Sequence, residues 1–180
     1  MMSFPDSFST ARLRAERVTD EHLDDLCQMD ADPEFMALLG GVRGGAETTA
    51  YLVANLRHWT EYGFGLWILR DRHSHRLAGR AVLRHVFIDE VDDVEVGYGI
   101  LPELWGHGLA TEIAAECVRR GFEDLGLESV VALTLPEHVR SQRVLGKVGL
   151  AYERDVMHGG LRHALFRTRR LDRTAARLRS

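Results

Sequence analysis

The chain has 180 residues and a mass of 20.3 kDa, which is the size of one ordinary domain. Its 45% hydrophobic and 28% charged residues exclude a disordered, collagen-like or disulfide-stapled chain, and its net charge of −4 gives no general nucleic-acid-binding footprint. No segment approaches the roughly 20 apolar residues of a membrane span, and residues 1–17 contain no apolar stretch long enough for the core of a secretory signal. We expect one domain over 1–180, with its core at about 10–170, in a cytoplasmic protein that binds neither nucleic acid nor membrane.

Three helices are predicted in the first third of the chain. Thr19 is a typical N-cap for a short amphipathic helix. Asp32 followed by Pro33 indicates a second helix start, and the glycine pair at 40–41 ends that helix. A third helix is predicted over about 46–62, where three large apolar side chains share one face.

The middle of the chain changes to the alternating pattern that is typical of β-strands. Strands are predicted over Phe64–Arg70 and Leu77–Ile88, joined by a polar turn at Asp71–His75. A further strand is predicted over Val94–Leu101. These strands form a meander, which places them side by side in one sheet.

The second half of the chain alternates helices and strands. A glycine-bearing loop at Gly106–Ala110 opens a helix whose apolar residues recur at helical spacing. A buried strand at Val130–Leu135, a helix at Val139–Val148 and a last strand at Ala164–Thr168 follow. This order predicts the α+β class, with a mixed sheet flanked by helices.

The loop before the long helix is the segment that points to a ligand. A strand that contains Glu95 runs into a turn with Gly106 and Gly108, and the turn opens directly into the helix. Helix N-termini leave backbone N–H groups unpaired, and glycines allow a ligand to approach the backbone, so this loop suits a phosphate or pyrophosphate. The alternative is that the two glycines only form a tight turn.

Two common nucleotide-binding motifs do not fit this loop. The sequence lacks the Gly-x-x-x-x-Gly-Lys-Ser/Thr pattern of ATP-binding loops. The dinucleotide fingerprint requires glycine or alanine where this chain has Thr111, and an acidic residue after the next strand, where Val130–Leu135 offers none. A nicotinamide-dependent enzyme is therefore a distant alternative.

The loop and a downstream segment together resemble a known family. Trp105–Ala110 resembles the acetyl-CoA pyrophosphate loop of the GNAT N-acetyltransferases, and Gly97–Glu112 matches the longer pattern of their Rim-type branch, which includes ribosomal-protein acetyltransferases. His138–Leu150 is similar to that branch's second motif, and so are Thr10–Arg14 and Asp32–Pro33. The resemblance extends from about residue 10 to residue 170 and implies the GNAT fold, with central strands that splay apart.

The resemblance also implies how acetyl-CoA is bound. The pyrophosphate would be held by backbone N–H groups along the loop, namely those of Gly106, His107, Gly108, Leu109, Ala110 and Thr111. The backbone of Tyr98 and Ile100 would pair with the pantetheine amides, and the Ile100 N–H would stabilise the reaction's oxyanion. His138 stands where the family usually has an asparagine that contacts pantetheine, and Arg143 would reach the phosphates of CoA.

Acetyl transfer also needs a base for the amine and a proton donor for the thiolate. We expect Glu95 to be the base, with its pKa raised by the neighbouring charge of Asp93. The alternatives are that Glu95 is one more solvated acid or that a water chain removes the proton. We expect Ser141 to protonate or hydrogen-bond the thiolate, because Leu145 occupies the position of the family's tyrosine acid. The alternative is that Ser141 is a plain helix residue.

The predicted activity is therefore direct acetyl transfer from acetyl-CoA to a primary amine, with the N-terminal α-amino group of a protein as the first candidate acceptor. A small-molecule amine is the alternative acceptor, and a non-catalytic CoA-binding regulatory domain is the alternative function. No metal is expected, because the His73-x-His75 turn has no further ligand at suitable spacing. The Arg-rich C-terminal tail, 171–180, is a candidate interface segment for a homodimer.

Overall fold

The computed structural model of the chain describes residues 5–171, so the Arg-rich tail, apart from Leu171, lies outside the described residues. The first half of the chain contains β1 (Ser7–Ser9), β2 (Leu13–Arg17), the short 3-10 helix η1 (Asp20–His22), α1 (Leu23–Ala31), α2 (Pro33–Met36), α3 (Gly45–Tyr62), β3 (Leu66–Asp71), β4 (Leu77–Ile88) and β5 (Val91–Ile100). The second half contains the 3-10 helix η2 (Pro102–Leu104), α4 (Leu109–Glu123), β6 (Ser129–Thr134), α5 (Val139–Lys147), β7 (Ala151–His158) and β8 (Leu161–Arg169).

The helix boundaries follow local chemistry. The Asp32 carboxylate accepts the backbone N–H groups of Glu34 and Phe35, which confirms Asp32 as the N-cap of α2. Gly63 follows α3 with a φ of 74°, in the left-handed region that glycine adopts without strain.

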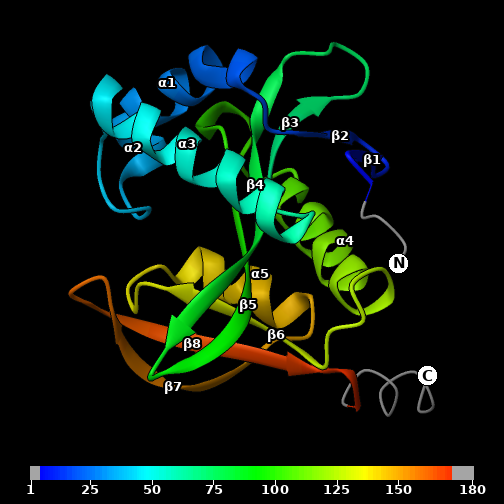
Figure 1. Ribbon diagram of the computed structural model, residues 1–180, viewed down its shortest axis with the longest axis vertical. Helices are drawn as coiled ribbons and strands as arrows, with labels where there is room; N and C mark the ends of the chain where they lie inside the picture. The colour runs from blue at the N-terminus through cyan, green and yellow to red at the C-terminus, as the bar shows by residue number, and fades with distance from the viewer. Residues whose placement is uncertain (1–4, 172–180) are drawn as a thin grey trace.

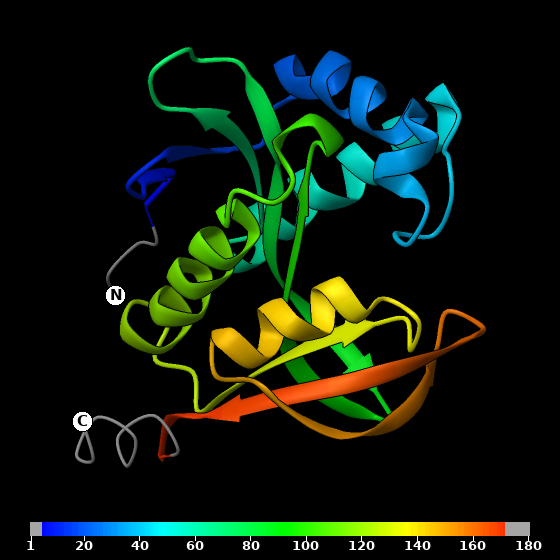
Figure 2. The same ribbon diagram turned by 180° about the vertical axis from the view of Figure 1, so that it is seen from behind.

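The strands form one mixed sheet in the order β1-β2-β3-β4-β5-β6-β8-β7. The first five strands are antiparallel neighbours in chain order, β5 and β6 are parallel, and β8 lies between β6 and β7 as their antiparallel partner. Helices α1–α3 cover one face of the sheet, and α4 and α5 cover the other (Figures 1 and 2). This arrangement confirms the predicted α+β class.

The sheet opens in its centre. Strands β4 and β5 pair continuously from Gly79–Ile100 to Ile88–Val91, but β5 and β6 pair only at Glu95–Val131. Beyond that pair the strands diverge, and β6, β7 and β8 run crosswise to β4 and β5 (Figure 2). The splay predicted from the resemblance is therefore present, and it leaves one edge of β5 without a strand partner.

Two hydrophobic clusters hold the sheet together. The larger one packs the helices against strands from both sides of the opening, and Trp67, Leu69 and Ile113 are fully buried in it. The smaller one joins the far end of β4 to β6, β7 and β8 through Ile88, Val131 and their neighbours. The strands on the two sides of the opening are therefore joined by shared packing as well as by the Glu95–Val131 pair.

The predicted elements were found with small changes in their bounds, but three strands were missed. The β4 prediction matches at both ends, whereas β5 begins at Val91, three residues earlier than predicted. The missed strands are β1, β2 and β7. Seven of the eight residues of β7 are not buried, so this edge strand has no buried-face alternation to reveal it.

Candidate active site

The loop between β5 and α4 has an open row of backbone N–H groups. Gly106 and Gly108 have φ angles of 81° and 77°, a conformation that side chains other than glycine rarely adopt. The first intrahelical bond is from the Glu112 N–H to the Gly108 carbonyl. Within the described residues, no backbone N–H from Gly106 to Thr111 donates to a protein carbonyl. The loop therefore has the unpaired donors that an anionic ligand needs.

The N-terminal part of the chain fixes this loop from outside. The Glu112 carboxylate accepts hydrogen bonds from the Thr10 hydroxyl and from the backbone N–H and Nε of Arg12. Arg12 Nη1 also donates to the His107 carbonyl at 2.7 Å. Burial raises the pKa of Glu112, but these hydrogen bonds outweigh it and lower the pKa below its ordinary value. Glu112 is thus an anchor for the loop, and Arg12 brings a positive charge beside it.

Trp105 joins the loop to β5 and to α5. Its indole Nε1 donates to the Ile100 carbonyl at 2.6 Å. The Arg140 guanidinium of α5 lies over the indole ring, 5.2 Å from its centroid. These contacts hold the loop against the diverging end of β5, while Gly106, His107 and Gly108 stay exposed.

The free edge of β5 presents the backbone groups named by the resemblance. The backbone N–H of Leu83 in β4 donates to the Gly65 carbonyl, on the β3 side. Leu83 and the residue opposite it on β5, Val96, are therefore a pair that does not exchange hydrogen bonds, and the backbone groups of Val96 point toward β6. Because this orientation repeats every second residue, Tyr98 and Ile100 also face the splayed gap. The Ile100 carbonyl is occupied by Trp105, but its N–H has no protein acceptor among residues 5–171.

A cavity of about 400 Å³ lies in this gap. Its lining comes from both faces of the sheet, with Arg43, Tyr51, Arg80, Arg84 and Glu95 on the α1–α3 side and Val96, Tyr98, Ser141 and Leu145 on the α5 side. The loop after α2 and the turn between β7 and β8 contribute its outer walls, and they lie at the same edge of the molecule (Figures 1 and 2). The cavity therefore connects the two sides of the sheet through the splay.

Two hydroxyl groups meet on the α5 side of the cavity. The Tyr98 phenol lies 3.2 Å from Ser141 Oγ and donates to the Ser141 carbonyl at 3.3 Å. Burial raises the pKa of Tyr98 to about 12, so the phenol keeps its proton at ordinary pH. The family resemblance implies a role only for the backbone of Tyr98, so the contact of its side chain with Ser141 is an addition from the structure.

Two more cavity residues have notable polar groups. His138 precedes α5 as its N-cap residue, and burial lowers the pKa of its imidazole. Thr134 of β6 is buried, and its hydroxyl has no hydrogen-bond partner among the described residues. A buried hydroxyl without a partner is costly, and a ligand in the cavity would provide one.

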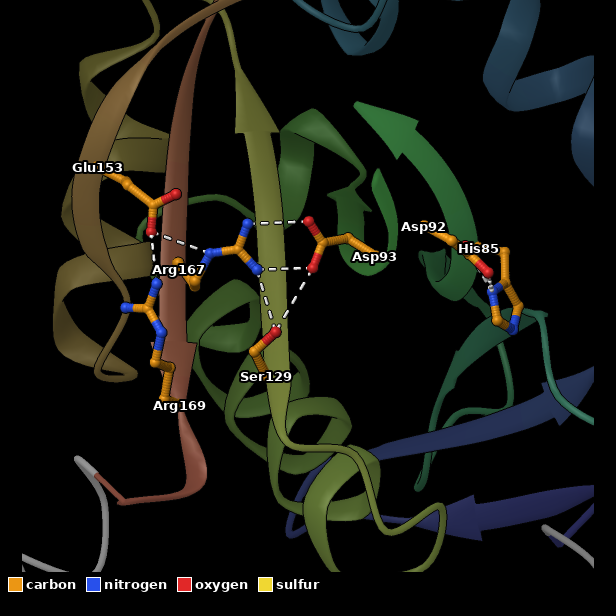
Figure 3. Close-up of polar contacts among 7 residues, drawn as sticks. All are labelled: His85, Asp92, Asp93, Ser129, Glu153, Arg167 and Arg169. Atoms are coloured by element: carbon orange, nitrogen blue, oxygen red, sulfur yellow. Dashed lines mark hydrogen bonds and ion pairs between the residues drawn. The ribbon is translucent and has the colours of Figure 1, made fainter. Parts of the chain in front are cut away.

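Two carboxylates of the acidic segment 89–95, Asp93 and Glu95, have different arginine partners. Asp93 and Glu95 lie on one face of β5, and both are buried. Asp93 accepts two hydrogen bonds from Arg167, at 2.6 and 2.8 Å, and also contacts Ser129 (Figure 3). The charge of Asp93 is therefore paired with that of Arg167.

Glu95 is paired with a different arginine. Arg84, opposite Glu95 on β4, donates its Nε to Glu95 Oε2 at 2.9 Å. Glu95 raises the pKa of Arg84, mainly by its charge. Glu95 is therefore neither a solvated acid nor a carboxylate coupled to Asp93. It is a buried member of an ion pair that borders the cavity.

A comparison with known proteins identifies the family. Residues 12–151 match the family model described as an acetyltransferase (GNAT) domain. The chain belongs to the GNAT acetyltransferases. As a GNAT enzyme it is an acetyl-CoA-dependent N-acetyltransferase.

Individual relatives share the fold with modest identity. The GNAT enzyme is 32% identical over 155 residues to a protein of Aspergillus fumigatus named FsC-acetyl coenzyme A-N(2)-transacetylase, covering 79% of this chain and 64% of that protein. An acetyltransferase structure from Agrobacterium tumefaciens has a TM-score of 0.82 at 19% identity, covering 94% of this chain and 97% of that one. The ribosomal-protein-S5-alanine acetyltransferase of Vibrio fischeri has a TM-score of 0.73 at 15% identity, covering 91% and 96%.

The structure brings only some of the predicted site residues of this GNAT enzyme together. Glu95, Tyr98, His138 and Ser141 line the cavity. The glycine loop lies outside that lining, as does Arg143, which is exposed on α5. In the described part of the chain, no cluster of potential metal ligands is found and no helix is long and apolar enough to cross a membrane.

Proposed function

We propose that the enzyme acetylates a primary amine by direct transfer, with the loop at 106–111 holding the pyrophosphate of acetyl-CoA. The main support for this position of the cofactor is the set of unpaired backbone N–H groups at Gly106–Thr111. Arg12 adds positive charge beside them, and the free edge of β5 at Tyr98 and Ile100 leads from the loop into the cavity. Thr134 would satisfy its buried hydroxyl on the bound thioester arm.

The reacting amine would enter from the α1–α3 side and meet Glu95. Arg84 occupies Oε2 of this carboxylate, and no hydrogen bond among the described residues occupies Oε1. Oε1 would accept a proton from the amine as its nitrogen bonds to the acetyl carbonyl carbon. The Ile100 N–H would stabilise the negative charge that develops on the carbonyl oxygen, a contribution on the order of 3 kcal/mol in a preorganised site.

The hydroxyl groups of Tyr98 and Ser141, on the α5 side of the cavity, would protonate the leaving thiolate. As the carbon–sulfur bond breaks, Ser141 would donate its proton to sulfur and take one from the Tyr98 phenol. Tyr98 would regain its proton from solvent after product release. The raised pKa of Tyr98 keeps the phenol protonated before the reaction begins.

The N-terminal α-amino group of a protein remains the first candidate acceptor. The Rim-type motifs support it, and the Vibrio fischeri neighbour is named for a ribosomal-protein alanine. A small amine is the second candidate, because the α2–α3 loop and the β7–β8 turn both border the cavity and restrict its mouth.

Alanine substitutions at two glycines, one before α4 and one after it, test the proposed cofactor site. Gly108 and Gly126 have φ angles of 77° and 70°, so alanine costs about 1–2 kcal/mol of strain at either position. Gly108→Ala also places a methyl group beside the unpaired backbone N–H groups of the loop. We therefore expect the Kd of this variant for acetyl-CoA to rise at least about tenfold. Gly126→Ala should leave the Kd unchanged.

The measurements are calorimetric binding of acetyl-CoA and thiol release with a panel of peptides and small amines. Equal effects of the two alanines on the Kd would remove the loop from the proposal. Saturable binding without thiol release on any amine would instead indicate a CoA-binding domain without turnover.

A further inference from the structure

The α1–α3 wall of the cavity is positively charged. Three arginines line it, Arg43, Arg80 and Arg84, whereas Glu95 is the one carboxylate in the lining. The acidic segment 89–95 would favour a cationic acceptor if it lined the cavity. In the structure the exposed acids of that segment lie at the tip of the β4–β5 hairpin, and they are not part of the lining.

Two of the three arginines are held by carboxylates. Arg84 is paired with Glu95, and Arg80 donates to the fully buried Asp30 at 2.7 Å. The Arg80 guanidinium also lies over the rings of Phe35 and Tyr51. These contacts fix both side chains and use most of the available negative charge.

Arg43 is the loosely held member of the group. Its Nη1 is 3.5 Å from each oxygen of Asp30, at the limit of a hydrogen bond, because Arg80 and Thr48 already occupy that carboxylate more closely. Its guanidinium stacks on the Tyr51 ring at 4.7 Å. Stacking orients the planar guanidinium while leaving donors free for a ligand.

The three guanidinium groups of the wall thus face only two carboxylates, Glu95 in the lining and the buried Asp30 behind it. An excess positive charge of this kind is stabilised by an anionic partner. A guanidinium that is held flat by an aromatic ring matches the geometry of a carboxylate, which it binds through two parallel hydrogen bonds. We propose that the acceptor carries a carboxylate close to its amine and that Arg43 binds this carboxylate while the amine lies at Glu95.

This inference rests on the proposed function, because it uses the same cavity and the same reacting amine. The carboxylate has two chemical sources: a small amino acid, or an acidic side chain next to the N-terminal residue of a protein. Both present the same group to Arg43, and matched acceptors separate them.

The experiment compares acceptors that differ only in the negative charge. The small pair is γ-aminobutyrate and γ-aminobutyramide, and the peptide pair begins Ser-Asp or Ser-Asn with an amidated C-terminus. We expect kcat/KM to favour the carboxylate member of one pair by at least about tenfold, since hydrogen bonds to charged groups discriminate strongly. The pair that shows the preference identifies the source.

Substitutions at Arg43 assign the preference to this residue. Arg43→Gln should abolish it, Arg43→Lys should retain part of it, and Arg43→Glu should favour the uncharged member. Arg57→Gln, an exposed arginine of α3 outside the cavity lining, is the matched control and should behave as the wild type.

Calorimetric binding of the same acceptors to the CoA-saturated enzyme gives the comparison without turnover. Turnover or binding without any preference for the carboxylate, or a preference that survives in Arg43→Gln, would overturn the inference and leave the proposed function intact. A binding preference for the carboxylate without turnover would support the carboxylate site at Arg43 and contradict the proposed catalytic roles.

Discussion

Asp93 and Glu95 are two buried carboxylates on the same face of one strand, yet the sheet uses them in different ways. Asp93 lies where β5, β6 and β8 are closed against one another, and Arg167 and Ser129 surround it (Figure 3). Glu95 lies two residues further, at the last point where β5 and β6 pair, and it borders the cavity. The position of the splay thus decides which carboxylate supports the fold and which is available for chemistry.

The network around Asp93 extends across the closed end of the sheet. Arg167 of β8 bonds to Asp93 of β5 on one side and to Glu153 of β7 on the other, and Arg169 also contacts Glu153 (Figure 3). Such a chain of ion pairs fixes the strands on one side of the opening. The Arg84–Glu95 pair is different, because the Arg84 side chain is 38% exposed and no hydrogen bond from residues 5–171 reaches Glu95 Oε1.

The largest expected effect is on stability at the closed end. Asp93→Asn leaves Arg167 without its main buried partner, and we expect a loss of about 3 kcal/mol in the free energy of unfolding. Urea unfolding measures the loss, and the folded variant should still release thiol. Replacing both residues, as Asp93→Leu with Arg167→Met, should recover much of the stability because no buried charge remains unpaired. A loss below about 1 kcal/mol in Asp93→Asn would mean that this end of the sheet does not depend on the pair.

The second effect is on the rate at the open end. Glu95→Gln keeps an oxygen for Arg84 but removes the proposed base, so we expect kcat/KM to fall on the order of 100-fold with little change in stability. Thiol release across pH 6–9 checks this, and Glu90→Gln at the hairpin tip is the control. A rate that stays unchanged over this range would exclude Glu95 from the mechanism and favour a water chain.

The smallest expected effect is on the pH dependence of stability and concerns His58, which lies next to the residue that Asp92 contacts. Asp92 points to the other face of β5 and contacts the His85 ring (Figure 3), while the His85 backbone N–H donates to His58 Nε2. Desolvation lowers the pKa of His58, so the folded state favours the neutral ring that can accept this bond. The stability from this preference is present above the unfolded pKa of about 6.5 and is lost as pH falls through the lower folded pKa.

We expect His58→Gln, whose side-chain oxygen can accept the same N–H, to show a smaller decrease in stability between pH 7 and pH 5 than the wild type. Urea unfolding at the two pH values measures the difference. An identical decrease in both proteins would assign the pH dependence to other histidines.

The N-terminal strands show where sequence patterns were insufficient. Thr10 and Arg12 belong to a short turn between β1 and β2, with no hydrophobic alternation that predicts its place in the sheet. Their hydrogen bonds to Glu112 cross about half the chain, and only folding brings these residues together. The contact of Arg12 with the glycine loop was therefore missed, although the loop itself was predicted.

The amino-acid sequence by itself determined the α+β class, the family and the glycine loop, because these depend on local periodicity, on the special backbone angles of glycine and on a contiguous motif. It also named Glu95, Tyr98 and Ser141, which tertiary structure brings to one cavity. Only the tertiary structure decided the charge partners of the acidic segment, the Tyr98–Ser141 contact and the arginine wall. Ion pairs are chosen among strands and helices that are distant in sequence, so the partner of a carboxylate is set by strand register and helix packing.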